Sequence, residues 1–190
     1  MTNRDYDRLA QAVQARLARH ERLIVAIDGR CGSGKTTLAA RLQQELGCTV
    51  FHMDDFFPRP EQRTEERLSR PGENVDHERF LAEVLLPLQH MQPVTYRPYL
   101  CARQQLGDPV TVTPSRLTIV EGSYASHPAL WEHYGLRVFL SVEPEEQLRR
   151  IEKRNGPEKA VMFRDRWIPL EEMYFKAFDV QARCDLSLHG

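Results

Sequence analysis

The sequence lacks the features that would place this protein in a membrane, outside the cell or on nucleic acid. No apolar run approaches the length of a bilayer span, and Arg and Asp are scattered through the first 20 residues, unlike a signal peptide. The net charge is −1 and no basic block is present, so nucleic acid is not indicated as a partner. We therefore expect a cytoplasmic protein that binds neither nucleic acid nor a membrane.

Patterns of metal-binding or disulfide-forming residues are also missing. The four cysteines form no C-x-x-C pair, and the seven histidines include no H-E-x-x-H pair. A zinc hydrolase is therefore not favoured, and reduced thiols are expected. The 190 residues are 41% hydrophobic and 28% charged, which is ordinary for one globular domain spanning residues 1–190.

The most informative segment is Gly29–Thr37, which reads G-R-C-G-S-G-K-T-T and fits the pattern G-x-x-x-x-G-K-[ST]. The apolar run Leu23–Ile27 before it is typical of a buried strand, and a helical pattern follows it. Glycines allow backbone N–H groups to close on phosphate oxygens, and the helix N-terminus adds positive partial charge. The segment predicts a nucleotide site for ATP, formed by Gly29, Arg30, Cys31, Gly32, Ser33, Gly34, Lys35, Thr36 and Thr37. Lys35 is expected to reach the β- and γ-phosphates, and the Thr36 hydroxyl to bind Mg²⁺.

Short apolar segments alternate with helical patterns along the chain. An amphipathic helix is predicted around residues 6–17, before the first strand. Strands are predicted at residues 23–28, 49–53, 117–121, 136–142 and 184–188, and helices at 35–46, 76–90, 144–154 and 164–180. Pro87 is expected to bend or end the second of these helices. Residues 94–99 and 109–113 alternate with period two around a polar turn, which predicts a hairpin outside the main sheet.

The alternation indicates an α/β fold. We predict a P-loop NTPase with a parallel sheet of about five strands, helices on both faces, a small β-hairpin and a lid. Residues 58–73 form a long, charged, proline-rich stretch without periodicity, which is typical of a functional or mobile loop.

Two further strand ends carry acids. Asp54 and Asp55 follow the second strand and precede Phe56 and Phe57, and Glu121 ends the central strand. Ligands of open α/β sheets bind outside the carboxyl ends of the strands. Asp54 is thus a candidate base beside a γ-phosphate, and Glu121 a candidate Mg²⁺ ligand. The alternative is that these acids are solvated loop or capping residues.

From these motifs, in this order, the chain resembles the uridine kinase and phosphoribulokinase group of P-loop kinases. The resemblance runs from Ile24 to Leu188. It rests on the phosphate loop and on the segments D-D-F-F (54–57), N-V-D-H (74–77), Y-R-P-Y (96–99), V-E-G (120–122), L-R-R-I-E-K-R (148–154) and C-D-L-S-L (184–188).

The resemblance implies a role for each matching residue. Asp54 would be the general base for a sugar 5′-hydroxyl, with Lys35, Arg149 and Lys153 as further catalytic residues and Arg154 at the nucleotide. The substrate-binding residues implied are Asp54, Phe57, Asp76, His77 and Tyr99, and the metal ligands are Thr36, Asp54 and Glu121. The cofactors implied are ATP and Mg²⁺, and the group also suggests a homo-oligomer.

The chain departs from the uridine kinase pattern where the acceptor is recognised. Asp55 and Phe57 replace Ser and Tyr, a form similar to nicotinamide riboside kinases, and Leu100 replaces an Asp that reads the base. The lid after Arg154 is short and lacks a second arginine cluster. The machinery for phosphoryl transfer therefore looks complete, while base recognition is open.

We predict an ATP- and Mg²⁺-dependent kinase of a small alcohol, with a nucleoside 5′-hydroxyl as the first expectation. Nicotinamide riboside, pantothenate or another small alcohol are alternative acceptors. A P-loop switch ATPase without a small-molecule acceptor is the alternative from another class. Cys31 is interpreted as a small loop residue rather than a redox switch, and His52 as a packed neighbour of Asp54.

Overall fold

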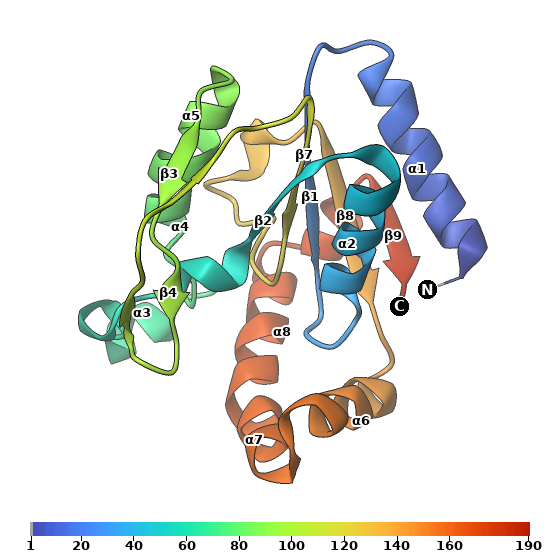
Figure 1. The fold of residues 1–190 in the computed structure, drawn as a ribbon. Coiled ribbons are helices and arrows are strands. Elements are labelled where there is room, and N and C mark those ends of the chain that lie inside the picture. The colour runs from blue at the N-terminus through green and yellow to red at the C-terminus, as the bar shows by residue number, and fades with distance from the viewer. Residues whose placement is uncertain (1) are drawn as a thin grey trace.

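A five-stranded parallel sheet forms the centre of the computed structural model, which describes residues 2–190 (Figure 1). The strand order is β2-β7-β1-β8-β9, and every neighbouring pair is parallel. The strands are β1 (Leu23–Gly29), β2 (Thr49–His52), β7 (Leu117–Glu121), β8 (Leu136–Ser141) and β9 (Leu186–His189). The predicted P-loop NTPase fold with about five parallel strands is confirmed.

Helices cover both faces of the sheet because alternate residues of each strand point to opposite sides. From β1, Val25 and Ile27 pack on one side with α1 (Asn3–Leu17) and α2 (Lys35–Leu46). Ile24 and Ala26 pack on the other side with residues of α5 (Leu86–Gln89), α8 (Ile168–Ala177) and the helices that precede α5. Each face thus has its own apolar core, and the inner strands β1, β7 and β8 are mostly buried.

The chain between β2 and β7 forms an additional layer beside the sheet. It contains η1 (Met53–Phe56), η2 (Pro60–Gln62), α3 (Glu65–Leu68), α4 (His77–Phe80), η3 (Leu81–Leu85) and α5. Two small antiparallel pairs follow, β3 (Val94–Tyr96) with β6 (Val110–Val112) and β4 (Tyr99–Leu100) with β5 (Gln105–Leu106). They confirm the predicted hairpin outside the main sheet.

Pro87 lies within the helical stretch without ending it. The stretch continues from His77 to Gln89, and residues 81–85, just before Pro87, form a wider π-type segment. A π turn shifts the hydrogen-bond pattern, so the missing N–H of a proline is accommodated.

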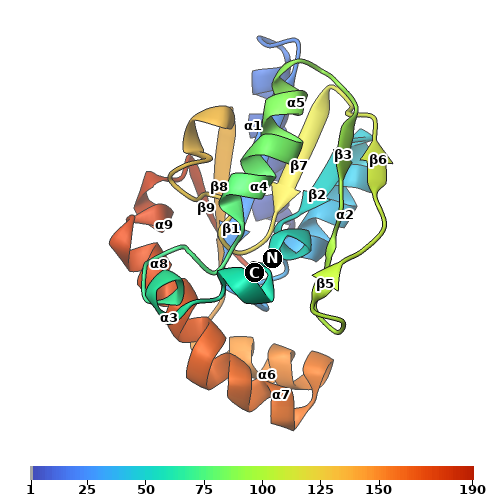
Figure 2. The ribbon, with the colours of Figure 1, turned by 90° about the vertical axis from the view of Figure 1, so that its left-hand side faces the viewer.

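The C-terminal third contains the segment that corresponds to a lid. After η4 (Trp131–His133) and β8 come α6 (Pro144–Asn155), α7 (Pro157–Met162), η5 (Phe163–Trp167), α8 and α9 (Val180–Arg183). Helical structure therefore begins at Pro157, earlier than the predicted residue 164, because Pro157 occupies a first helical position that suits it. Helices α6 and α7 lie together at one end of the molecule (Figure 2).

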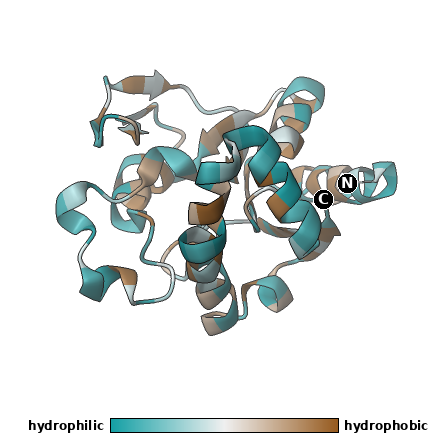
Figure 3. Cartoon of the chain, turned by 90° about the horizontal axis from the view of Figure 1, so that it is seen from below, coloured by the Kyte–Doolittle hydropathy of each residue, from teal (hydrophilic) through white to brown (hydrophobic). Residues whose placement is uncertain are grey.

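Hydrophilic residues predominate in α6, whereas α7 carries the exposed apolar residues Val161 and Met162. Seen from below, the helices carry long hydrophilic stretches, interrupted by single apolar turns (Figure 3). No helix within residues 2–190 is both long and apolar enough to cross a membrane.

Candidate active site

The phosphate loop connects the end of β1 to the start of α2. Gly29, Gly32 and Gly34 all have positive φ angles, between +74° and +133°, which side chains disfavour. A Cβ on Gly29 would lie 2.0 Å from the backbone oxygen of Leu140, so this position requires glycine. The Lys35 ammonium donates to the carbonyl oxygens of Gly29 at 2.6 Å and Arg30 at 2.9 Å. The loop thus has the shape and charge of an anion site.

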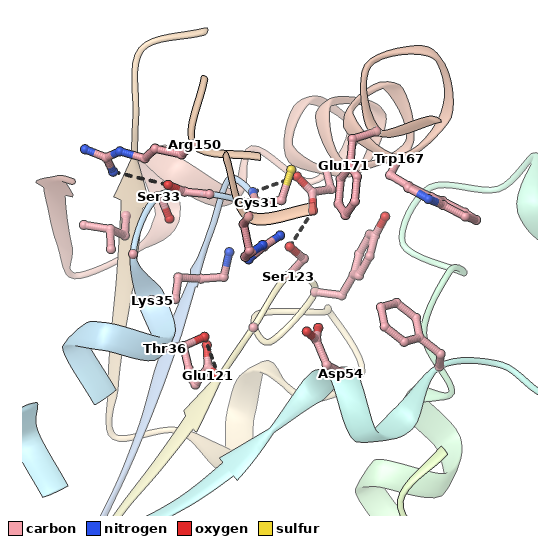
Figure 4. A pocket seen from close by; sticks show the side chains of 18 of the residues that line it. Cys31, Ser33, Lys35, Thr36, Asp54, Glu121, Ser123, Arg150, Trp167 and Glu171 are labelled. Carbon is pink, nitrogen blue, oxygen red and sulfur yellow. Dashed lines mark hydrogen bonds between the residues drawn. The ribbon is translucent and has the colours of Figure 1, made fainter. Parts of the chain in front are cut away.

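Helix α8 holds the first half of the phosphate loop. The Cys31 amide donates to a Glu171 carboxylate oxygen at 3.0 Å, and the other oxygen accepts from the Ser123 hydroxyl at 2.6 Å (Figure 4). The neighbouring Glu172 forms a two-point ion pair with Arg30, at 2.6 and 3.1 Å.

Helix α6, which precedes α7, also contacts the phosphate loop. The Gln147 amide donates to the Cys31 carbonyl at 3.0 Å, and Arg150 donates to the Gly32 carbonyl at 3.2 Å. The two helices that flank α7 and η5 are therefore both attached to the phosphate loop.

Asp28 is a buried carboxylate at the base of the site. Its oxygens accept from the amides of Gly29 (2.6 Å), Tyr124 (3.2 Å) and Ser126 (2.8 Å) and from the Tyr174 hydroxyl (2.8 Å). Full burial raises the pKa of Asp28 to about 6, against the lowering effect of these hydrogen bonds. Asp28 connects the phosphate loop, the chain after β7 and helix α8.

Oxygen ligands for a divalent cation meet beside the start of α2. The Thr36 hydroxyl donates to Glu121 Oε1 at 3.1 Å, because β1 and β7 are neighbours in the sheet. His52 Nδ1, from the adjacent β2, lies 2.6 Å from the same oxygen, and this hydrogen bond raises the pKa of His52. A hydroxyl beside a carboxylate is a donor set that fits Mg²⁺.

Asp54 faces the phosphate loop across one cavity of about 1120 Å³. Figure 4 shows its carboxylate and the Lys35 ammonium pointing into the same space. The side chain of Asp54 is exposed to this cavity, but the surrounding protein desolvates it and raises its pKa. The charge of Lys35 lowers this pKa and that of Glu121 raises it. The carboxylate is therefore a stronger base than an ordinary surface aspartate.

We name the two ends of the cavity after the ligands that the sequence predicts, a phosphate end and an acceptor end. The phosphate end is formed by the loop and by basic side chains of the lid region. The loop contributes residues 31–37, and the basic residues are Arg150, Arg154 and Lys159. The acceptor end, which we define by its lining residues, consists of Asp54, Phe57, Arg63, Asn74, Cys101 and Ala102.

Among the predicted substrate residues, Asp54 and Phe57 line the cavity, whereas Asp76, His77 and Tyr99 are not among its lining residues. Asp76 is buried and caps α4, accepting from the Arg79 amide at 3.1 Å. Tyr99 is buried in β4. Asp76 Oδ2, His77 Nε2 and the Tyr99 hydroxyl are buried without a hydrogen-bond partner among the described residues, and the roles of these three residues stay predictions.

His77 stacks on His127, with ring centroids 4.0 Å apart and planes 13° from parallel. Ligand atoms of these two histidines and of Glu73 lie within 4.8 Å of one another. Nitrogen lone pairs lie in the ring planes, so nearly parallel rings do not converge on one ion. We assign no metal to this cluster.

The basic residues of α6 lie at different places relative to the cavity. Arg154, predicted at the nucleotide, lines it together with Arg150, four residues away on the same helix face. Arg149 and Lys153 do not line the cavity, and Arg149 pairs with Glu146 at 2.6 Å on the exposed surface. The catalytic roles of Arg149 and Lys153 stay predictions.

Of the nucleotide residues predicted, Cys31–Thr37 line the cavity, while Gly29 and Arg30 shape the loop through their backbone and the Glu172 ion pair. Burial raises the pKa of the Cys31 thiol, and Glu171 raises it further, which disfavours a reactive thiolate.

Several residues at the site were not found by sequence reasoning. Asp28, Ser123 and Glu171 have no motif signal, since their positions depend on contacts distant in sequence. Asn74 and Arg150 lie in the segments N-V-D-H and L-R-R-I-E-K-R but were not singled out. His52 was interpreted as a packed neighbour of Asp54, and its hydrogen bond to Glu121 was not predicted. Arg63 lies in a stretch without periodicity, and only its charge could have drawn attention.

No family model matches the chain. Solved structures do resemble it. A protein from Bacillus stearothermophilus provisionally named a uridine kinase is 22% identical, with 98% of each chain covered and a TM-score of 0.73. A protein from Silicibacter sp. TM1040 provisionally named a fructose transport system kinase is 25% identical, with 98% of each chain covered and a TM-score of 0.75. D-glycerate 3-kinase from Cryptococcus neoformans is 17% identical, covers 88% of this chain and 87% of its own, and has a TM-score of 0.59. The chain therefore has the fold of P-loop kinases, and the resemblance to the uridine kinase group is confirmed at the level of the fold.

Proposed function

We propose that this protein transfers the γ-phosphoryl group of ATP to a hydroxyl of a small molecule. The observation that carries the proposal is Asp54, a carboxylate of raised pKa in the same cavity as the phosphate loop. A switch ATPase needs no base at this place, whereas a kinase needs one near the acceptor hydroxyl. The kinase fold of the structural neighbours supports the same proposal.

The reaction follows from the positions of these side chains. The acceptor oxygen attacks the γ-phosphorus while its proton passes to Asp54. The bond from the γ-phosphorus to the bridging oxygen breaks, and its electron pair leaves with ADP. Lys35 and the loop amides hold the phosphates, and Arg150 and Arg154 stabilise the transferred charge.

A metal completes the site. Thr36 and Glu121 are the residues that would hold Mg²⁺, which neutralises phosphate charge when bound. Asp54, the third predicted ligand, faces the same cavity, and we assign it the role of base.

The Asp54→Asn variant tests the proposal. An amide keeps the shape of the side chain but cannot accept the proton, so turnover should fall about 10²- to 10⁴-fold. ATP affinity, measured by calorimetry, should change little. Asp55→Asn is the matched control, because Asp55 accepts from the Tyr96 hydroxyl at 3.0 Å and does not line the cavity. Near-normal turnover in the Asp54 variant would remove this residue from the role of base.

The acceptor class implied by the sequence resemblance is a nucleoside, and nicotinamide riboside and pantothenate are its alternatives. A panel of these compounds, with ADP formation as the readout, separates them. A rate independent of every acceptor would instead favour the switch ATPase. The single-domain organisation, the cytoplasmic location and a homo-oligomeric state remain predictions from the sequence.

A further inference from the structure

The acceptor end of the cavity contains one cation, Arg63. Its Nε donates to the Pro58 carbonyl at 2.8 Å, and its guanidinium lies over the Tyr99 ring, 5.4 Å from the centroid. These two contacts fix the direction of the side chain.

Arg63 forms no ion pair with any acid in residues 2–190. Its two terminal nitrogens also have no hydrogen-bond partner within this part of the chain, although the side chain is partly buried. A partly desolvated guanidinium is stabilised by an anion, and it binds a carboxylate through two parallel hydrogen bonds.

Arg63 is also well placed relative to the base. Both side chains line the same cavity, and no ion pair or hydrogen bond joins them within residues 2–190. A small molecule bound in this cavity can therefore contact both. One end of that molecule would present a hydroxyl to Asp54, and the other would meet the guanidinium.

The rest of the acceptor end has few hydrogen-bonding groups for the edge of a nucleobase, although the aromatic residues Tyr124, Phe163 and Trp167 also line the cavity. The hairpin contributes Cys101 and Ala102, and Leu100 stands beside them. Phe57 adds an apolar surface, and Asn74 is the remaining polar group. Recognition therefore depends more on the sign of charge than on a pattern of base hydrogen bonds.

We propose that the acceptor is an anionic alcohol, a small hydroxy acid whose carboxylate binds Arg63 while its hydroxyl lies at Asp54. This inference rests on the proposed kinase function and selects among its acceptor classes. A cationic nucleoside such as nicotinamide riboside would be repelled, and a neutral nucleoside would leave the guanidinium without a counter-charge. The carboxylate takes no part in the reaction: the hydroxyl oxygen gains the phosphoryl group, its proton goes to Asp54, and ADP leaves.

The test compares acids with neutral alcohols of similar shape. ADP formation is measured with D-glycerate against glycerol and with pantothenate against pantothenol, and with uridine and nicotinamide riboside as further acceptors. At least one of the two acids should stimulate turnover more than its neutral counterpart.

Variants of Arg63 then assign the effect to this side chain. Arg63→Gln should lower kcat/KM for the acid about 10- to 100-fold, mainly through KM, because a charge-assisted hydrogen bond is lost. The KM for ATP should stay within about twofold, since the loss lies outside the phosphate end. Arg63→Lys should recover part of the loss, and Arg103→Gln is the control, because Arg103 is exposed and does not line the cavity. If Arg63→Gln does not fold, the proposal is decided by the wild-type rates with acids and their neutral counterparts and by the kcat/KM of Arg63→Lys for the acid.

The outcomes separate this inference from the proposed function. Turnover with uridine or nicotinamide riboside but with neither acid would overturn the anionic acceptor and leave the kinase function standing. An acid that serves equally well in the Arg63→Gln variant would also overturn it. ATP binding without stimulation by any acceptor would count against both.

Discussion

Replacing Asp28 by asparagine should change how the stability of the protein depends on pH. The Asp28 carboxyl has a pKa of about 6 in the folded protein and 3.8 as its ordinary value. Because the folded pKa is raised, its contribution to stability is fully present below pH 3.8 and is lost as the pH rises through 6. The rise in pKa corresponds to a contribution of about 3 kcal/mol to the free energy of unfolding at low pH. About 1.4 kcal/mol of this contribution is lost between pH 5 and pH 7.5.

Asparagine removes this titration at a local cost. Its oxygen can still accept from the Gly29 and Tyr124 amides, but its NH₂ group would face the Ser126 amide, another donor. The Tyr174 hydroxyl can reverse its direction and accept. One unsatisfied amide costs about 1–3 kcal/mol at any pH, so it cancels when two pH values are compared.

The assay is urea unfolding of both proteins at pH 5 and pH 7.5. The free energy of unfolding of the wild type minus that of Asp28→Asn should be about 1.4 kcal/mol smaller at pH 7.5 than at pH 5. Asp185→Asn provides a control without pH dependence in this range, because Arg137 holds the pKa of Asp185 below its ordinary value of 3.8 and the carboxyl is ionised at both pH values. For Asp28→Asn, a difference that is equal at the two pH values would refute the reasoning, since Asp28 would then titrate as an exposed carboxyl.

Two further substitutions test the contacts around the phosphate loop. Glu171→Ala removes the acceptor of the Cys31 amide and should raise the KM for ATP roughly 5- to 20-fold. In Glu171→Gln the amide can accept from Cys31 and donate to Ser123, so the KM for ATP should stay within about threefold of the wild type. Equal effects of the two substitutions in steady-state kinetics would exclude this positioning role. Gly122→Ala places a Cβ 2.8 Å from the Met53 Cβ at a φ of +138°, so a loss of about 2 kcal/mol or more is expected in chemical denaturation, and an unchanged midpoint would contradict the close approach.

Local patterns were enough to predict most of the fold. The strands are short apolar runs, and α2 begins directly at Lys35, so periodicity and the glycine motif located them within one or two residues. The π-helical segment at residues 81–85 was not predicted, because a single π turn does not change the spacing of apolar residues enough to be recognised in the sequence. The start of α7 was missed because the short stretch 157–163 is mostly exposed and its apolar residues lie next to one another, without helical spacing.

The candidate site was predictable only where a motif fixes the backbone. Lys35, Thr36 and Glu121 follow from strand ends that a parallel sheet brings together. The choice between Arg149 and Arg150 depends on the rotation of α6 by one residue, about 100°, which a polar helix sequence does not define. Glu171 is assigned by contacts from α8 to residues 140 positions earlier, and no local pattern reports such a separation.

The lining of the acceptor end comes entirely from residues 54–102. This stretch belongs to the chain that leaves the sheet at β2 and returns at β7, and these two strands are hydrogen-bonded neighbours. An insert between adjacent strands can be exchanged without altering the order of the sheet or the loop that holds phosphate. Evolution, or a designer, could therefore replace residues 58–116 with a different acceptor-binding segment and keep both the phosphate loop and Asp54.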